Sequence, residues 1–178
     1  MKKLIQLGLV FILVFSIGFA LSCKKAEKVE AEEVVAAVDL KAAKVAVNSV
    51  LDQWIQMVNT ENSELLSKLM AHDPDMVSFG TDAAERWVGY ESAENAMKKV
   101  FESVEESKGT SRERVIVVHK SGEVAWWSEF LDWTGKAQGE SFAFEGARLT
   151  GVMEKRNGNW VIVQVHSSVP VPGQAVKY

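Results

Sequence analysis

Apolar side chains recur at steps of three and four residues through the first half of the folded part of the chain. This spacing predicts one long helix over residues 40–58, a short helix over 63–70 and a third helix over 91–104. Asp39 is the expected N-cap of the first helix, because its carboxylate can accept a hydrogen bond from an amide of the first turn. A short strand is expected over residues 76–79.

The pattern changes to an alternation of period two after residue 113. Four strands are predicted, over residues 113–119, 123–134, 140–155 and 159–169. The links between them are short and contain glycine or asparagine, which is typical of consecutive antiparallel hairpins. Helices followed by such a meander predict an α+β domain, in which helices cover one face of a curved, mostly antiparallel sheet.

The first 22 residues carry a third pattern. They begin with Lys2 and Lys3 and continue with an almost wholly apolar run from Leu4 to Leu21. A basic start, an apolar middle and a small residue at the end are typical of a secretory signal. A run of about 18 residues could also just span a bilayer, so a transmembrane anchor remains an alternative.

Cys23, the only cysteine of the chain, directly follows this run. The segment Ala20-Leu21-Ser22-Cys23 resembles a bacterial lipobox, although Ala20 stands where a large aliphatic residue is usual. The resemblance implies an exported lipoprotein that is anchored to a membrane by lipid on Cys23, with its domain in the periplasm or at the cell surface. Lys24 is not the aspartate that retains some lipoproteins at the inner membrane, so the outer membrane is favoured.

The chain therefore divides into four predicted parts. These are a signal peptide over 1–22, the lipidated cysteine with a spacer over 23–38, a folded domain over 39–172 and a tail over 173–178. The spacer is rich in Ala, Glu, Lys and Val and contains no aromatic residue, which is typical of a linker.

The composition of the chain limits the kinds of binding partner that we expect. The chain has 20 lysine and arginine residues against 24 aspartate and glutamate residues, for a net charge of −4. A net acidic chain argues against nucleic acid as a partner, because phosphate binding needs clustered cations. The His, Cys, Asp and Glu residues do not have the spacing of a metal site, and no phosphate-binding motif is present. We therefore predict neither a metal nor a cofactor.

The C-terminal hairpin carries the most informative motif. It contains Ala147-Arg148-Leu149-Thr150, then a turn at Asn157-Gly158-Asn159, then Trp160 with an aliphatic run, and finally His166-Ser167-Ser168. This order resembles the SnoaL-like branch of the NTF2-like superfamily over about residues 40–170. The resemblance implies a cone, in which three N-terminal helices close a curved sheet around an apolar pocket. It implies no single reaction, since members include cyclases, isomerases, dehydratases, binding modules and dimerisation domains.

The turn of this hairpin decides which side chains face the pocket. A three-residue loop with a bulge pairs Thr150 with His166, whereas a two-residue loop puts Leu149 and Met153 on the His166 face, and turn chemistry allows both. The family resemblance favours the first. We therefore expect a polar cluster at the pocket that consists of Arg148, Thr150, His166 and Ser168. The cluster could orient a polar group of a ligand or form a structural network.

The chain contains six tryptophans. We select Trp54 and Trp126 as ligand contacts, although a place in the core is the commoner role for tryptophan. Trp126 and Trp127 are adjacent on a strand, so one should face the pocket and the other should face outward. The outward indole would need cover, and a homodimer across the sheet is the simplest source.

Three functions remain open from the sequence. The preferred interpretation is a non-enzymatic module that binds a small apolar ligand, dimerises, or does both. The alternatives are an isomerase, hydratase or cyclase that acts on an apolar carbonyl compound, and a protein-interaction scaffold. An isolated carboxylate facing the cavity within an apolar shell would favour the enzyme. No catalytic residue is identified from the sequence.

Overall fold

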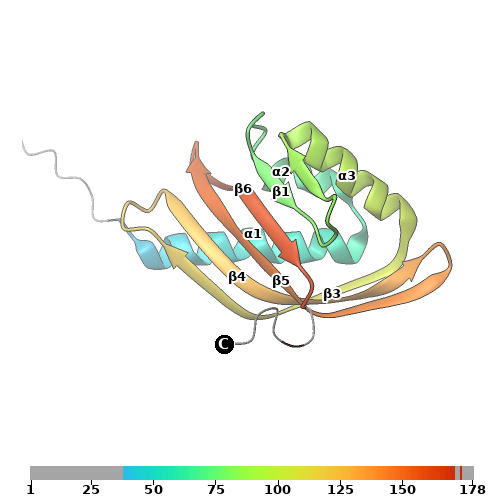
Figure 1. The fold of residues 1–178 in the computed structure, drawn as a ribbon. Helices are drawn as coiled ribbons and strands as arrows, with labels where there is room; N and C mark the ends of the chain where they lie inside the picture. The colour runs from blue at the N-terminus through green and yellow to red at the C-terminus, as the bar shows by residue number, and fades with distance from the viewer. Residues whose placement is uncertain (1–37, 171–172, 174–178) are drawn as a thin grey trace, which may run out of the picture. The chain divides into compact units, whose positions relative to one another are not determined.

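The computed structural model describes residues 38–170 and residue 173. The predicted signal peptide, Cys23 and nearly all of the spacer and tail lie outside the described residues. The described part is an α+β domain, in which helices pack on one face of a curved six-stranded sheet (Figure 1). The fold class predicted from the sequence is therefore confirmed. Among the helices that are described, none combines the length and the apolar character needed to cross a membrane.

The helical elements follow the predicted pattern closely. They are α1 (Leu40–Thr60), a 3-10 turn η1 (Ser63–Leu65), α2 (Leu66–Leu69) and α3 (Tyr90–Ser103). Asp39 caps α1 as predicted, because its carboxylate accepts a hydrogen bond from the Ala42 amide at 2.9 Å. The apolar face of α1 is buried, and its five buried residues are Val47, Leu51, Trp54, Met57 and Val58.

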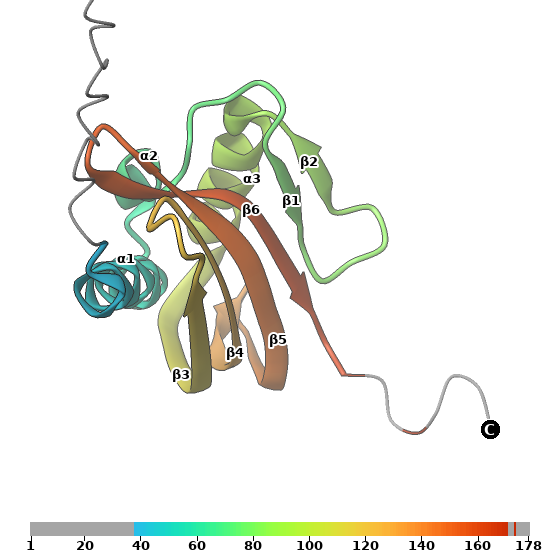
Figure 2. The same ribbon diagram turned by 90° about the vertical axis from the view of Figure 1, so that its left-hand side faces the viewer.

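The strands are β1 (Val77–Phe79), β2 (Arg86–Val88), β3 (Val104–Val118), β4 (Val124–Ala137), β5 (Glu140–Arg156) and β6 (Asn159–Ser168). They lie in the order β2-β1-β6-β5-β4-β3. Only the β1–β6 pair is parallel among neighbouring strands of this sheet. Figure 2, in which α1 is seen nearly end-on, shows the long strands curving around the side where α1 and α3 pack.

Two elements differ from the prediction. Strand β2 was not predicted, because three residues between loops show no periodicity of their own; its pairing with β1 makes it a strand. Strand β3 begins at Val104, directly after α3, and not at residue 113. The segment from Glu105 to Arg112 is polar because β3 is an edge strand, and two register shifts interrupt its alternation.

The β5–β6 turn combines both registers considered for it. Asn157 and Gly158 form a two-residue turn with positive φ at both positions, as a type I′ turn requires. Met153 consequently pairs with Ile162 near the turn. A register shift then follows, so Thr150 still pairs with His166, as predicted for the longer loop.

A buried ion pair fastens α1 to the sheet. The Glu129 carboxylate on β4 faces inward, is 4% exposed and accepts a hydrogen bond from Arg114 Nε at 2.6 Å. The Arg114 guanidinium also donates to Asn48 Oδ1 on α1 at 3.0 Å and pairs with Asp52. Burial lowers the pKa of Arg114, but its hydrogen bonds to Glu129 and Asp52 outweigh burial and raise that pKa above its ordinary value. The guanidinium therefore stays charged beside Glu129.

Replacing Arg114 should reveal how strongly this pair holds the fold. Arg114→Met leaves the Glu129 charge buried without a cation, so we expect a loss of about 3 kcal/mol in the free energy of unfolding by urea denaturation. The matched control is Arg112→Met on the same strand, whose partner Asp132 is solvent-accessible. It should change stability far less. Equal losses in the two variants would contradict a structural role for the buried pair.

Candidate functional site

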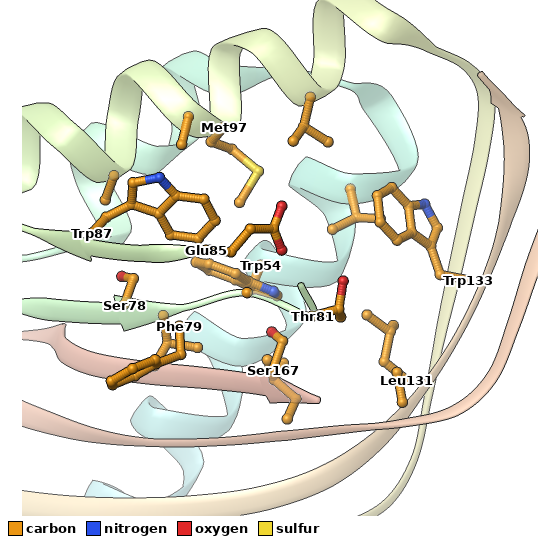
Figure 3. Close-up of a pocket in the computed structure, with 18 of the residues that line it drawn as sticks. Trp54, Ser78, Phe79, Thr81, Glu85, Trp87, Met97, Leu131, Trp133 and Ser167 are labelled. Carbon is orange, nitrogen blue, oxygen red and sulfur yellow. The ribbon is translucent and has the colours of Figure 1, made fainter. Parts of the chain in front are cut away.

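A cavity of about 200 Å³ lies between the helices and the sheet. All three α-helices, the β1–β2 hairpin and strands β4, β5 and β6 contribute to its wall (Figure 3). The lining is mostly apolar, and its aromatic members are Trp54, Phe79, Trp87, Phe101, Trp133 and Phe144. The side chains of the domain therefore do not fill the interior of the cone.

Among the residues that the structure describes, Glu85 is the only carboxylate in the lining of this cavity. It ends the loop between β1 and β2, and its Oε2 accepts a hydrogen bond from the Asp82 amide at 3.0 Å. Figure 3 shows its carboxylate extending into the pocket, with Trp87, Met97 and Trp54 around it. The carboxylate therefore faces the cavity within a largely apolar shell.

Gly80 makes the position of Glu85 possible. The Gly80 amide donates to the Glu85 carbonyl oxygen at 2.9 Å, which closes the β1–β2 loop. A Cβ at Gly80 would collide with the Glu85 carboxylate and would lie 2.8 Å from Cη2 of Trp87. A glycine here thus lets the carboxylate and the indole both approach the backbone of β1 closely.

Ser78 supplies a second polar group to the lining. It lies on β1, is 5% exposed, and its Oγ has no hydrogen-bond partner among the described residues. A buried hydroxyl without a partner is destabilising, because it has lost its hydrogen bonds to water. A polar atom of a ligand would restore one of them. Thr81 and Ser167 add two further hydroxyl-bearing residues to the wall.

The polar cluster predicted at the pocket lies mainly elsewhere. Thr150, His166 and Ser168 are not part of the cavity lining, and Arg148 is part of it but is exposed. The four residues do share one face, as predicted, but it is the outer face. The apolar neighbours of these residues, such as Leu149 and Val165, take the inner face, where they are buried. Hydrophobic burial therefore decides the face, against the assignment that the family resemblance favoured.

Of the two tryptophans predicted as ligand contacts, only one lines the cavity. Trp54 lines the cavity at 5% exposure, as expected for a ligand contact. Trp126 does not line it; this side chain is 46% exposed on the outer face. Its neighbour Trp127 is the inward residue, 3% exposed, and its indole lies over Gly151. One tryptophan of the pair faces in and one faces out, but their assignment is the reverse of the predicted one.

Sequence reasoning missed Glu85, Ser78 and Trp87 as residues of the site. They belong to the β1–β2 hairpin, whose second strand was not recognised. The available signal was the short segment Gly80-Thr81-Asp82 between Phe79 and an isolated Trp87, which is compatible with a loop joining two short strands.

The chain matches a known domain family in sequence, and its fold resembles several solved structures. The model of the SnoaL-like domain matches residues 47–172. An NTF2-like superfamily protein from Salmonella enterica serovar Typhimurium has a similar structure, with a TM-score of 0.69 at 18% identity, over 78% of this chain and 99% of that one. No curated protein sequence matches the chain significantly.

Two further solved structures show the same likeness. A candidate association domain of a calcium/calmodulin-dependent protein kinase II from Xanthomonas campestris has a TM-score of 0.61 at 26% identity, over 71% of this chain and 87% of that one. A candidate scytalone dehydratase from Novosphingobium aromaticivorans has a TM-score of 0.66 at 10% identity, over 74% of this chain and 87% of that one. The SnoaL-like match covers most of the described residues, and the chain therefore belongs to the SnoaL-like domain family, with an NTF2-like fold.

Proposed function

We propose that the domain binds a small, mostly apolar organic molecule in the cone pocket. The observation that carries the proposal is an unfilled apolar cavity whose lining includes an unpartnered buried hydroxyl, that of Ser78. Pockets with mostly apolar walls and a few converging polar groups are the usual form of a small-molecule site.

The size of the cavity limits the ligand. An engineered apolar cavity of about 150 Å³ accommodates benzene. At about 200 Å³, the pocket suits a single ring with a short substituent better than a steroid or a polycyclic compound. The indoles of Trp54 and Trp87 would contact the ring, and one polar substituent would reach Ser78 or Glu85.

An enzyme is the second candidate function, and Glu85 is the observation that favours it. A carboxylate that faces a cavity within an apolar shell can act as a general base or acid toward a bound substrate. In that role Glu85 would take a proton from a carbon next to a carbonyl group, as an isomerase or hydratase requires. Some structural neighbours carry dehydratase names, but at identities of 10% and 12% they show the fold alone.

We also propose that the chain is an exported lipoprotein, tethered to a bacterial membrane through lipid on Cys23, with the outer membrane favoured. The lipobox-like segment supports this proposal.

A homodimer is proposed on the outer face of the sheet. Val117 pairs with Trp126 in register, and Val115 lies two residues before Val117, so the three side chains share this face. They are 38%, 46% and 56% exposed, respectively. A second copy that presents the same surface would bury all three by an isologous contact. A protein-interaction scaffold would use the same face for a different partner.

Filling part of the cavity should weaken ligand binding. Ala96 on α3 lines the pocket, so Ala96→Leu should weaken the binding of single-ring compounds at least about tenfold, because the added methyl groups occupy ligand space. Tryptophan fluorescence titration measures this, since three indoles line the cavity. Ala42→Leu, on the exposed side of α1, is the matched control and should bind as the parent does. Equal affinity in all three proteins would contradict binding in this pocket, and recovery of a chemically altered ligand would favour the enzyme.

If Cys23 is lipidated, the parent protein and the Cys23→Ser variant should differ in mass and in membrane affinity after expression in cells. Mature protein with Cys23 should carry the mass of attached acyl chains and should partition into detergent, because two or more chains anchor durably. Cys23→Ser should lack the lipid mass and stay in the aqueous phase. Intact-protein mass spectrometry decides the matter, and an unlipidated Cys23 in a lipoprotein-processing host would overturn the anchor.

A charge introduced on the outer face of the sheet should dissociate the proposed dimer into monomers. Trp126→Glu should give a monomer by sedimentation velocity at micromolar concentration, because each copy would bury a carboxylate without a cationic partner in the interface. Val45→Glu provides the control, since Val45 is 66% exposed on α1, away from the sheet face. A monomeric parent protein would refute the dimer outright.

A further inference from the structure

We propose that the pocket selects an organic cation, meaning a protonated amine or quaternary ammonium group joined to one small apolar ring. This inference rests on the proposed ligand-binding function and adds the charge of the ligand to it. It arises from the contrast between Glu129 and Glu85, two carboxylates that face the interior.

Glu129 and Glu85 differ in how their charges are balanced. Glu129 has Arg114 at 2.6 Å. Glu85 takes part in no ion pair within the described part of the chain, where its carboxylate accepts only the Asp82 amide. Arg148, the one cation of the cavity lining, is exposed and forms no ion pair with Glu85. A partly dehydrated carboxylate is stabilised by an opposite charge, and a cationic ligand would supply one.

The aromatic residues of the wall favour the same charge. Trp54, Trp87 and Trp133 line the cavity, and Figure 3 places the Glu85 carboxylate between Trp87 and Trp133. The electron-rich face of an indole attracts a cation, most strongly when water is excluded. Indoles in the same wall as the carboxylate thus suit an ammonium group with carbon substituents. A metal ion would need more oxygen ligands than this single carboxylate provides.

The β1–β2 hairpin brings the two kinds of contact together. Gly80 lies against both the Glu85 carboxylate and the edge of the Trp87 indole. A cation beside this glycine could contact the carboxylate and the indole at once. The Ser78 hydroxyl, which has no partner in the described residues, can accept an N–H from a protonated amine or bind another polar substituent of the ligand.

The decisive experiment compares two ligands of equal shape and different charge. Benzyltrimethylammonium and neopentylbenzene differ only in a positively charged nitrogen in place of a carbon. We expect the full-length protein to bind the cation about tenfold more tightly than the neutral isostere, measured by tryptophan fluorescence titration at constant ionic strength.

Variants test whether Glu85 causes the preference for the cation. Glu85→Gln, which is nearly isosteric, should bring the affinity for the cation down to that for neopentylbenzene, with the neutral compound little changed. Glu102→Gln removes one exposed carboxylate from α3, outside the cavity lining, and should keep the preference. Gly80→Ala, which displaces the Glu85 carboxylate, is the second test if Glu85→Gln fails to fold; it should lower the preference as well.

The outcomes separate this inference from the proposed function. Equal binding of the two compounds, or tighter binding of neopentylbenzene, overturns the selection of a cation while the apolar pocket stands. A preference that survives in Glu85→Gln overturns the role of the carboxylate. If neither compound binds the parent protein, both the inference and the ligand-binding proposal fail.

Discussion

The bend of the sheet is the constraint on which the rest of the domain depends. Strands of 14 to 17 residues, β3 to β5, would extend well beyond the helices if they ran straight. Register shifts interrupt all three ladders among β3, β4, β5 and β6, and each extra residue bends its strand and increases the local twist. The sheet therefore wraps around α1 and α3. A curved sheet and straight helices do not match in shape over their whole length, which leaves room for the cavity.

Two carboxylates on the concave side differ in how the rest of the domain supports them. Glu129 accepts hydrogen bonds from Arg114 and Ser111, and Arg114 in turn donates to Asn48, so this ion pair joins α1 to the edge of the sheet. Glu85 lies in a loop closed by Gly80 and faces an aromatic wall without such a partner. The charge of Glu129 is thus balanced by Arg114 within the chain. The second carboxylate has no cationic partner among the described residues and accepts only the Asp82 amide.

The two faces of the sheet carry different kinds of side chain. Leu149 and Val165 point to the interior and hold the helices by burial, whereas Thr150 and His166 point outward beside Trp126. Because side chains alternate along a strand, one choice of face settles the place of every residue on it. The His166-Ser167-Ser168 motif thus sends Ser167 into the cavity lining and leaves His166 on the outer face.

The sequence by itself determined the elements whose periodicity is long. The apolar stripe of α1, its Asp39 cap and the alternation in β4 to β6 each require one structure, because local geometry and burial agree over several turns or pleats. The order of these elements, together with the hairpin motif, was enough for the α+β class and the family.

Which residues form the candidate site could be recognised only from the tertiary structure. Strand β2 is too short to show a period and exists through its pairing with β1, so Glu85 and Trp87 had no visible place in a pocket. The face of His166 depended on a register shift, opposite Val152 and Met153, that no turn rule reveals. Long periodic segments average over many local preferences, but a pocket depends on a few side chains whose positions are set by contacts distant in the sequence.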